Sequence, residues 1–339
     1  MSESLESVAI AIGAPGRGIL AADESTGTIK KRFDSINVES TEDNRRDYRE
    51  MLFRTEQAMR ENISGVILFD ETIRQKAKDG TPLVDLIKAA GSIPGIKVDQ
   101  GAKDMAFHPG EKVTEGLTGL RERLNEYYEL GARFAKWRAV IDIAADIPTP
   151  ACIKANAHAL GRYAALCQEA NIVPIVEPEV LMDGDHDIDR CYEVTEATLR
   201  ALFAELYEQR VKLEGTVLKP NMVISGKKCA KQASVEEVAE KTIRCFKQAV
   251  PAAIPSIVFL SGGQSDEDAT AHLNAMNAIG GFPWQVSFSY GRALQAAPLK
   301  AWGGKEENVA AAQAAFAHRA AMNGLATKGE WKAALEKAA

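Results

Sequence analysis

The sequence predicts an α/β protein whose core is one closed barrel of parallel strands. Three observations support this prediction. About eight short β-branched runs alternate with helical patterns, and such alternation is typical of a parallel sheet. Eight strands are also the number that closes a (β/α)8 TIM barrel. Finally, the 339 residues contain no Pro/Gly/Ser-rich linker or change in composition that would divide them into separate domains.

The predicted elements can be placed in order along the chain. The strands are rich in β-branched residues and bounded by turn residues, and they cover residues 18–23, 65–70, 96–100, 133–138, 172–179, 215–221, 256–263 and 284–291. Apolar residues at three- and four-residue spacing indicate helices between them, most clearly at 115–130, 153–170, 192–208 and 235–249. We therefore expect one domain over residues 1–339, with the barrel at about 18–300, helical extensions at both ends, and the C-terminal one at about 301–339.

The composition excludes several classes of protein. With 41 Lys and Arg against 47 Asp and Glu, the chain has a formal net charge of −6, whereas nucleic-acid-binding proteins usually have a basic excess. The five cysteines are scattered without a Cys-x-x-Cys pair, which indicates reduced thiols. Residues 1–6 lack the features of a signal peptide, and no run of about 18 apolar residues is present to span a bilayer. We expect a cytoplasmic protein that binds neither nucleic acid nor membranes.

Lys219 is the most informative single residue. It lies in the β-rich run 215–221, where an ammonium group has no structural reason to be, because lysine is seldom buried without a partner. Desolvation, or a second cation nearby, favours the neutral amine, and a neutral amine attacks carbonyl carbons. The sequence therefore predicts Schiff-base chemistry at Lys219.

Other charged and polar residues follow the same pattern at the carboxyl ends of the predicted strands, where the active sites of barrels are built. They are Asp23, Lys97, Lys136, Arg138, Glu177, Glu179, Ser261 and Arg292. Alternation along a strand places Lys136 and Arg138 on one face, and Glu177 and Glu179 on one face of the next strand. Lys136, Glu177 and Lys219 should then be neighbours, with Lys136 favouring the neutral amine and Glu177 transferring protons. A purely structural ion-pair network is the alternative.

The last two predicted strands suggest a site for phosphate. Ser261-Gly262-Gly263 and Tyr290-Gly291-Arg292 each lead from a strand into a helical pattern, so backbone N–H groups and an arginine can face an anion. Barrels often bind phosphate after strands seven and eight. Lys31 and Arg32 offer a second anion site, although such a basic run is more often a solvated helix face.

Several other segments receive simpler interpretations. Residues 44–50 are predicted to be a solvated helix face, and Trp137 to pack against the helix layer. The five histidines show no metal-ligand spacing, and residues 183–187 lack the spacing of a calcium loop. No Gly-x-Gly-x-x-Gly follows a strand, so a dinucleotide is not expected. The sequence thus predicts neither a metal ion nor a cofactor.

The strand ends together resemble those of class I fructose-1,6-bisphosphate aldolases. The matching segments occur in order at 18–27 (GILAADESTG), 134–138 (FAKWR), 176–179 (VEPE), 218–221 (LKPN), 260–264 (LSGGQ) and 289–294 (SYGRAL). The resemblance extends from about residue 13 to 329. It implies a reversible cleavage of fructose 1,6-bisphosphate into dihydroxyacetone phosphate and glyceraldehyde 3-phosphate through a lysine imine, in glycolysis and gluconeogenesis.

The resemblance also implies roles for the catalytic candidates. Lys219 would attack the C2 ketone, and Glu177 would act as acid and base in forming and dehydrating the carbinolamine. Lys136 and Glu179 would give electrostatic support, and Asp23 would accept the proton of the C4 hydroxyl. The residues that match substrate-binding positions are Ser261, Gly262, Gly291 and Arg292 for the C1 phosphate, and Ser25, Thr28, Lys31, Arg32, Lys97 and Arg138 for the hydroxyls and the C6 phosphate.

Some properties stay open at this point. No tyrosine follows Tyr290, whereas animal members of the family end in a tyrosine that assists proton exchange, so another donor and a slow late step are expected. Thr28 stands where many members have serine. The family implies a homotetramer, with a dimer as the alternative. A pyridoxal-phosphate enzyme and a non-catalytic scaffold are the competing functional hypotheses, and a preference for fructose 1-phosphate is not readable from the sequence.

Overall fold

Parallel strands form a closed barrel in the computed structural model, which describes residues 4–337. Residues 1–3 and 338–339, including part of the segment interpreted above as lacking a signal peptide, lie outside the described residues. Within the described residues, eight strands form the closed barrel in the order β1-β10-β9-β8-β7-β6-β3-β2. They are β1 (Gly18–Ala22), β2 (Ile63–Leu68), β3 (Ile93–Lys97), β6 (Phe134–Ile141), β7 (Val173–Val180), β8 (Val217–Leu218), β9 (Ser256–Phe259) and β10 (Gln285–Tyr290). The predicted TIM barrel is therefore confirmed.

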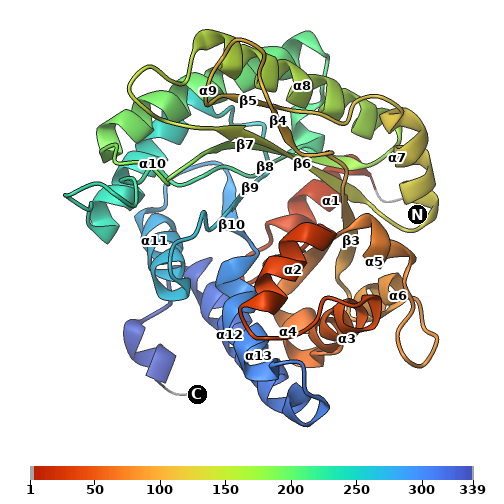
Figure 1. Cartoon of the computed structure of the whole chain (residues 1–339). Coiled ribbons are helices and arrows are strands. Elements are labelled where there is room, and N and C mark those ends of the chain that lie inside the picture. Colours follow the sequence, from red (N-terminus) through yellow and green to blue (C-terminus); the bar gives the residue numbers. More distant parts are fainter. Residues whose placement is uncertain (1–3, 338–339) are drawn as a thin grey trace.

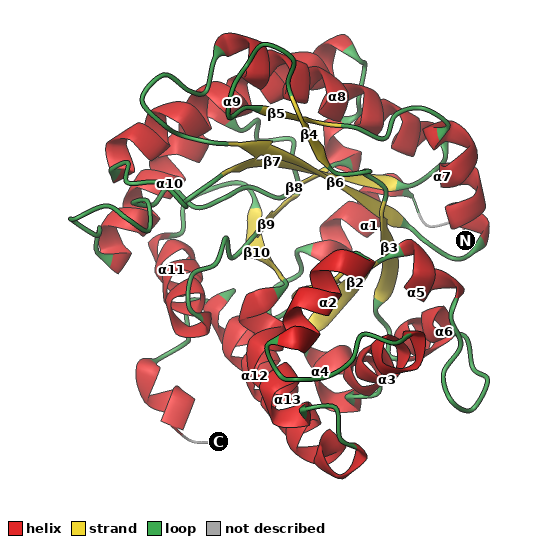
Figure 2. Ribbon diagram, in the orientation of Figure 1, coloured by secondary structure: helices red, strands yellow, loops and turns green. Residues whose placement is uncertain are grey.

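Helices surround the ring of strands (Figures 1 and 2). In the described part of the chain they are α1 (Leu5–Ile12), α2 (Thr26–Asp34), α3 (Glu42–Phe53), α4 (Glu56–Glu61), α5 (Asp70–Arg74), α6 (Leu83–Ala89), α7 (Leu120–Glu129), α8 (Pro150–Glu169), α9 (Ile188–Glu208), α10 (Val235–Ala249), α11 (Asp266–Ile279), α12 (Arg292–Trp302) and α13 (Val309–Ala326). Short 3-10 helices lie at Leu213–Gly215, Glu306–Asn308 and Ala333–Lys337. None of the described helices is both long enough and apolar enough to cross a bilayer.

Helix caps explain where several helices begin. The side chains of Thr149, Asp187 and Ser234 accept hydrogen bonds from backbone N–H groups in the first turns of α8, α9 and α10. Such caps satisfy donors that have no partner within the helix. Helix α10 has the predicted bounds, whereas α8 and α9 begin three and four residues earlier than predicted because the caps at Thr149 and Asp187 precede the apolar pattern.

The segment before α7 differs from the prediction. Residues 115–119 were expected to be helical, but Gly116 and Gly119 have φ angles of 132° and 67°, which break a helix at this point. A small antiparallel pair, β4 (Ala102–Asp104) and β5 (Lys112–Thr114), occupies the loop between β3 and α7. The sequence analysis missed this pair because its two strands have only three residues each.

The two faces of each barrel strand bury different sets of residues. The outward faces pack against the helices in the main hydrophobic core; there Trp137 stacks near Tyr163 of α8 at a centroid distance of 5.5 Å, as predicted. The inward faces form a second cluster with α1, which includes Ile12, Ile67 and Val173. Figure 1 shows α1 within the outline of the strand ring, where it closes the barrel interior with apolar side chains.

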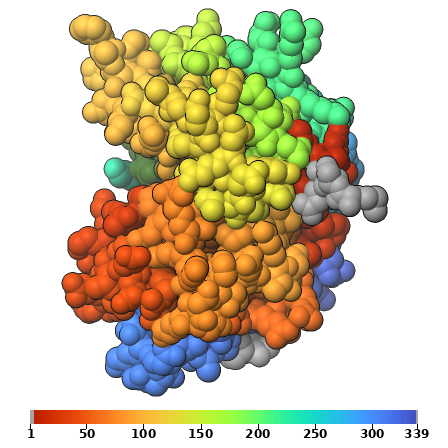
Figure 3. All heavy atoms as spheres, turned by 90° about the vertical axis from the view of Figure 1, so that its right-hand side faces the viewer, coloured from red at the N-terminus to blue at the C-terminus, as the bar shows by residue number. Residues whose placement is uncertain are grey.

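The C-terminal helices lie beside N-terminal ones. Helix α13 contacts α3, α4, α11 and α12, and Gln313 donates a 3.1 Å hydrogen bond to the carbonyl of Met51 in α3. Figure 3 shows this proximity on one face, where the blue C-terminal segment borders orange segments from the first hundred residues. Contacts between distant segments thus hold this side of the helix layer together.

Phe134 fills the barrel interior opposite two glycines, and this packing gives a first testable prediction. A Cβ added to Gly95 would lie 2.2 Å from a ring carbon of Phe134, and one added to Gly65 would lie 2.8 Å away. Phe134 is fully buried, so its ring has no free space to enter. Gly95→Ala is expected to lower the free energy of unfolding by about 1–3 kcal/mol, measured by urea denaturation.

Gly27→Ala is the matched control for this overpacking. A Cβ at Gly27 meets nothing within 4 Å, and Gly27 lies in helix α2, where alanine is intrinsically favoured. This variant should be as stable as the wild type or slightly more stable. Equal unfolding midpoints for the two variants would show that the ring of Phe134 does not limit the space at Gly95.

Candidate active site

A cavity of about 510 Å³ opens at the carboxyl ends of the barrel strands and gathers every predicted site residue. The predicted residues that line it are Asp23, Ser25, Thr28, Lys31, Arg32, Lys97, Lys136, Arg138, Glu177, Glu179, Lys219, Ser261, Gly262, Gly291 and Arg292. They come from segments spread from the first strand to the last helix of the barrel. Their convergence follows from the parallel topology, which brings all carboxyl ends to one side.

Four charged groups, three of them buried and the fourth 13% exposed, form the centre of the cavity. Lys219 follows β8, and its Nζ lies 3.3 Å from Oε1 of Glu177 on β7. Lys136 on β6 lies 3.6 Å from the other oxygen, Oε2 of Glu177, and 2.7 Å from Oδ2 of Asp23. The side chains of Lys136, Lys219 and Glu177 are at most 5% exposed. The two lysines therefore share one carboxylate, and among the described residues Lys136 has a second carboxylate within 4 Å whereas Lys219 does not.

Electrostatics fix the charges of Asp23 and Lys136. Burial opposes ionisation of Asp23, but the charges of Lys136, Lys219 and Lys97 outweigh it and hold the pKa of the Asp23 carboxyl at about 2. Burial likewise disfavours the charged form of Lys136, but Asp23, Glu177 and Asp99 together raise the pKa of Lys136 well above its ordinary value. At neutral pH, Asp23 is thus a carboxylate and Lys136 an ammonium ion.

Further ion pairs hold the walls around this centre. Arg138, on the same face of β6 as Lys136, pairs with Glu179 of β7. Lys97 at the end of β3 lies 2.8 Å from Oδ1 of Asp99, and Asp99 Oδ2 accepts a 3.3 Å hydrogen bond from the backbone N–H of Arg138. Asp99 thus connects the ends of β3 and β6, a role that the sequence analysis did not assign to it.

The turns after β9 and β10 line one side of the cavity, where the sequence predicts an anion site. Ser261 is buried, and Gly262 and Gly263 follow it with φ angles of 60° and 90°, a conformation that suits glycine. Helix α12 begins at Arg292 directly after Gly291, so its free N–H groups face the same side. Within the described residues, the guanidinium group of Arg292 forms no hydrogen bond or ion pair. This site, made by Ser261, Gly262, Gly263, Gly291 and Arg292, is called the phosphate cup below.

Helix α2 forms the wall next to the phosphate cup, because it follows β1, which pairs with β10, and Nη2 of Arg32 lies 3.8 Å from a Cβ built on Gly291. Ser25 and Thr28, in its first turn, have hydroxyl oxygens 3.1 Å apart. Lys31 is exposed and lines the cavity without an ion pair among the described residues, whereas Arg32 lies 3.2 Å from Oε1 of Glu24. The basic pair at 31–32 therefore lines the cavity and also faces solvent.

The interpretation of residues 44–50 as a solvated face was wrong. Arg45, Tyr48, Arg49 and Glu50 are all buried. Arg49 is 1% exposed and donates a 2.8 Å hydrogen bond to the carbonyl of Glu24 beside Asp23. The sequence contained a signal for this burial. Residues 45, 48, 49 and 52 have the spacing of one helix face, and Tyr48 and Leu52 make that face apolar enough to be buried.

Arg49 gives a second testable prediction. Its guanidinium group lies 3.9 Å from the Glu24 carboxylate, which is 5% exposed, and 3.5 Å from that of Glu71. Arg49→Met removes one of the cations that neutralise the buried carboxylate of Glu24. It is therefore expected to lower the free energy of unfolding by about 3 kcal/mol. Arg60→Met is the control, because it breaks a pair with Glu56 in which the two side chains are 64% and 76% exposed. It is expected to lower the free energy of unfolding by less than about 1 kcal/mol. Equal unfolding curves for the two variants would contradict a structural role for Arg49.

Ser289 is a cavity residue that sequence reasoning missed. It is 1% exposed, lies on β10, and lines the cavity beside Gly291. Its hydroxyl group has no hydrogen-bond partner within the described chain, which is unusual for a buried polar atom. Its inward position two residues before Gly291 was the available signal, because alternation places both on one face.

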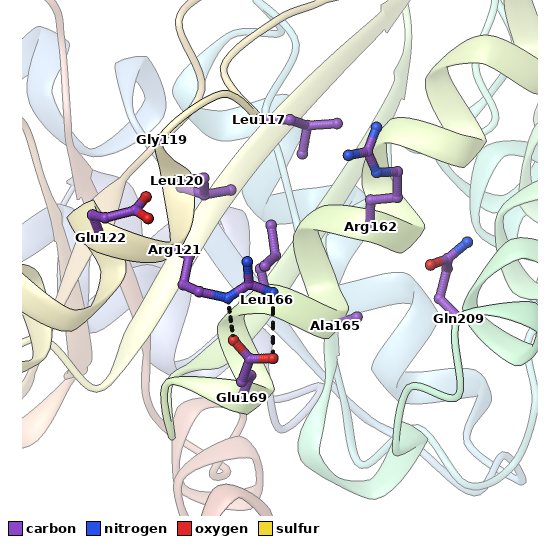
Figure 4. A pocket seen from close by; sticks show the side chains of 10 residues that line it. All are labelled: Leu117, Gly119, Leu120, Arg121, Glu122, Arg162, Ala165, Leu166, Glu169 and Gln209. Carbon is purple, nitrogen blue, oxygen red and sulfur yellow. Dashed lines mark hydrogen bonds and ion pairs between the residues drawn. The ribbon is translucent and has the colours of Figure 1, made fainter.

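A second cavity lies on the outside of the barrel, between α7 and α8 (Figure 4). It has a volume of about 410 Å³, and Arg121 spans it by pairing with Glu169 at 2.5 Å. Both side chains are more than half exposed, so water screens their charges. Its lining residues include no lysine, and its two glutamates, Glu122 and Glu169, are exposed. The cavity at the strand ends is the better candidate for catalysis.

The fold and the strand-end cavity define the general class of this protein. It is a barrel enzyme whose strand-end cavity combines two buried lysines, a carboxylate that both lysines contact, and the arginine Arg292. Sites with such perturbed charges are typical of catalysis rather than of packing.

Comparison with known proteins identifies the family. The family model described as fructose-bisphosphate aldolase class-I matches residues 4–339, and the chain belongs to this family. A probable fructose-bisphosphate aldolase class 1 of Xanthomonas campestris is 63% identical over 331 residues, covering 97% of this chain and 99% of that protein. The cytosolic fructose-bisphosphate aldolase 6 of Arabidopsis thaliana is 58% identical over 322 residues, covering 95% and 89%.

A solved structure agrees with this result. A fructose-bisphosphate aldolase from Plasmodium falciparum, crystallised with TRAP and a small-molecule inhibitor, superposes with a TM-score of 0.94. It is 49% identical, and the superposition covers 97% of this chain and 95% of that one. The resemblance noted from the sequence motifs is therefore confirmed at the level of the family and of the fold.

Proposed function

We propose that this chain catalyses the reversible aldol cleavage of fructose 1,6-bisphosphate to dihydroxyacetone phosphate and glyceraldehyde 3-phosphate. The reaction proceeds through an imine on Lys219 and serves glycolysis and gluconeogenesis. The iminium ion withdraws electrons from the bond that breaks, so the proposed reaction requires no metal ion or cofactor.

The different surroundings of the two central lysines carry this proposal. Lys136 has two carboxylates within 4 Å, and the closer one, Asp23, holds it as an ammonium ion. Lys219 has only Glu177 within that range among the described residues, at 3.3 Å, so it can give a proton to that carboxylate. The Oε2 atom of Glu177 accepts no hydrogen bond within the described chain and lies 3.6 Å from Lys136, so it keeps the capacity to accept a proton. Lys219 is therefore the nucleophile, and Lys136 the fixed cation.

The proposed steps give each group a defined role. The amine of Lys219 attacks C2, and Glu177 protonates the resulting hydroxyl so that it leaves as water and the iminium ion forms. Asp23 accepts the C4 hydroxyl proton, the C3–C4 electron pair moves toward the iminium nitrogen, and glyceraldehyde 3-phosphate departs. Water or a cavity carboxyl group then gives a proton to C3 of the enamine, and water hydrolyses the resulting iminium ion to release dihydroxyacetone phosphate and the amine of Lys219. Lys136 and Glu179 stabilise the changing charges around Glu177.

The two phosphates are assigned to two separate groups of residues that line the cavity. The C1 phosphate binds in the phosphate cup, where Arg292 has no protein counterion among the described residues. The C6 phosphate and the hydroxyls bind near Ser25, Thr28, Lys31, Arg32, Lys97 and Arg138. Cations in both groups suit a substrate with a phosphate at each end.

We also propose the setting in which the enzyme works. It acts in the cytoplasm on a small sugar phosphate and assembles as a homotetramer, with a dimer as the alternative. Sedimentation equilibrium distinguishes the two assemblies.

Cleavage of fructose 1,6-bisphosphate in the presence of a metal chelator tests the proposed activity. The triose phosphates are measured as they form, and full activity is expected with the chelator present. Fructose 1-phosphate, compared at equal concentrations, shows whether the α2 wall contributes to specificity for the second phosphate. Absence of cleavage, or its loss with the chelator, would overturn the proposal.

A further inference from the structure

Lys227 lies at the edge of the phosphate cup without having been assigned any role. It belongs to the loop between β8 and α10, outside the segments that match the family motifs. A Cβ built on Gly263 of the cup would lie 2.7 Å from Nζ of Lys227. The same point is 2.9 Å from Nη2 and 3.1 Å from Nη1 of Arg292. Two cations from different loops thus converge beside one glycine of the cup.

Backbone hydrogen bonds hold the loop of Lys227 in this position. The N–H of Lys227 donates to the carbonyl of Met182 at 2.7 Å, and the N–H of Lys228 donates to that of Gly184 at 3.0 Å. Both acceptors belong to the loop between β7 and α9. Met182 also reaches the cup, because its Sδ lies 3.0 Å from a Cβ built on Gly262. The position of Lys227 is therefore set by the same loop that borders the cup.

Asp183 is the protein partner of Lys227. Its Oδ1 lies 2.8 Å from Nζ of Lys227, and the two side chains are 61% and 37% exposed. The hydrogen bond from Lys227 lowers the pKa of the Asp183 carboxyl despite partial burial, with smaller effects from Arg292 and Arg138. An exposed pair of this kind contributes little to stability and exchanges partners easily.

We propose that Lys227 is an additional binding residue for the C1 phosphate, and that the phosphate displaces Asp183 as its partner. The inference rests on the proposed function, because it adds a ligand to the phosphate cup. A phosphate dianion carries more charge than a carboxylate, and in the cup it lies between Arg292 and Lys227, so both cations bind it at once. When the cup is empty, Asp183 pairs with Lys227, and it competes with an incoming phosphate for that lysine.

Binding of inorganic phosphate and of dihydroxyacetone phosphate to the full-length protein tests this inference without requiring turnover. Isothermal titration gives the dissociation constant of each ligand for the wild type, Lys227→Met and Lys228→Met. Lys227→Met is expected to raise both constants about 5- to 10-fold, as for the loss of one charge-assisted hydrogen bond that is partly exposed. Lys228→Met is the matched control: it removes an exposed lysine from the same loop and leaves both constants unchanged.

The exchange of partners makes a sharper prediction for Asp183. Asp183→Asn removes the competitor and is expected to lower both dissociation constants about 2- to 5-fold. In the Lys227→Met background the same substitution should have no further effect, because Asp183 acts through Lys227. An equal gain in affinity in both backgrounds would show that Asp183 acts by repelling the phosphate directly. That result would overturn the proposal that Lys227 exchanges Asp183 for the phosphate.

Two further outcomes separate this inference from the proposed function. If Lys227→Met binds both ligands as tightly as the wild type does, the phosphate does not contact Lys227 and the inference fails, whatever the activity. If the wild type binds phosphate with the expected dependence on Lys227 but does not cleave fructose 1,6-bisphosphate, the proposed function fails and the assignment of Lys227 holds.

Discussion

Replacing Lys219 by methionine is expected to lower kcat for cleavage of fructose 1,6-bisphosphate on the order of 10⁴-fold or more, because no other group can form the imine. Lys219→Arg should lose as much activity, since a guanidinium group keeps the charge but does not attack a ketone. Both variants should stay folded, because Lys219 follows a two-residue strand and its side chain contacts only Glu177 among the charged groups described. Kinetics with the triose products measured directly, together with circular dichroism, check these expectations.

Chemical trapping then identifies the nucleophile directly. Borohydride reduction in the presence of dihydroxyacetone phosphate should attach the triose to the peptide that contains Lys219 in the wild type and to no peptide in Lys219→Met. An adduct on Lys136 in the variant would show that the second buried lysine is also available as a neutral amine. That result would contradict the division of roles derived from the 2.7 Å pair between Lys136 and Asp23.

The barrel could be predicted from the sequence because each strand carries its own local signal. The run 172–179, for example, forms β7 over Val173–Val180, within one residue of the prediction. The ends of the strands were less predictable, because backbone pairing with the neighbouring strands decides where a strand begins and ends. β3 begins at Ile93, three residues before the predicted start, where Ile93 pairs with Gly65 of β2.

The candidate site was predictable where strand alternation sufficed. Alternation places Lys136, Glu177 and Lys219 at the ends of consecutive parallel strands, and the structure brings these three together. The 2.7 Å pair between Lys136 and Asp23 could not be predicted in the same way, because β6 and β1 are not neighbours in the barrel. This pair forms across the barrel, so it depends on the distance between β6 and β1, and local sequence patterns do not predict that distance.

The loop contacts were still less accessible to sequence reasoning. Lys227 reaches the phosphate cup only because two loops, after β7 and after β8, are joined by backbone hydrogen bonds. Neither loop carries a periodic pattern that would predict this contact. Contacts of this kind become visible only in three dimensions.

Lys136→Met is expected to damage both activity and stability. Lys136 pairs with both Asp23 and Glu177, so its removal leaves Asp23 without an ion-pair partner among the described residues and leaves Glu177 with Lys219 alone. Breaking a buried pair in this way costs about 3–5 kcal/mol of the free energy of unfolding. A fall in kcat on the order of 10³-fold is also expected, because the fixed charge that supports Asp23 and Glu177 is lost. Urea denaturation at one protein concentration and steady-state kinetics measure the two effects.

The pH dependence of that loss of stability has a definite sign. In the wild type the pKa of Asp23 is about 2, below its ordinary value of 3.8, so Asp23 contributes stability above pH 3.8 that is lost as the pH falls through 2. Without Lys136 the pKa of Asp23 rises, and the folded variant binds a proton that the folded wild type does not. The stability difference between wild type and variant should therefore grow as the pH increases from about 2 toward neutrality. A difference that is constant with pH would contradict the coupling between Lys136 and Asp23.

Removing both partners separates the electrostatic effect from a packing defect. In Asp23→Asn/Lys136→Met no unpaired Asp23 charge remains, so most of the stability lost in Lys136→Met should return, because a buried pair replaced as a unit often costs little. Activity should not return, since the proposed proton acceptor for the C4 hydroxyl is absent. If the double variant is as unstable as Lys136→Met, the lysine stem stabilises the barrel by packing, and the charge of Asp23 is not the cause. Recovery of stability without activity would instead show that this ion pair is kept for catalysis at a net cost to folding that other contacts offset.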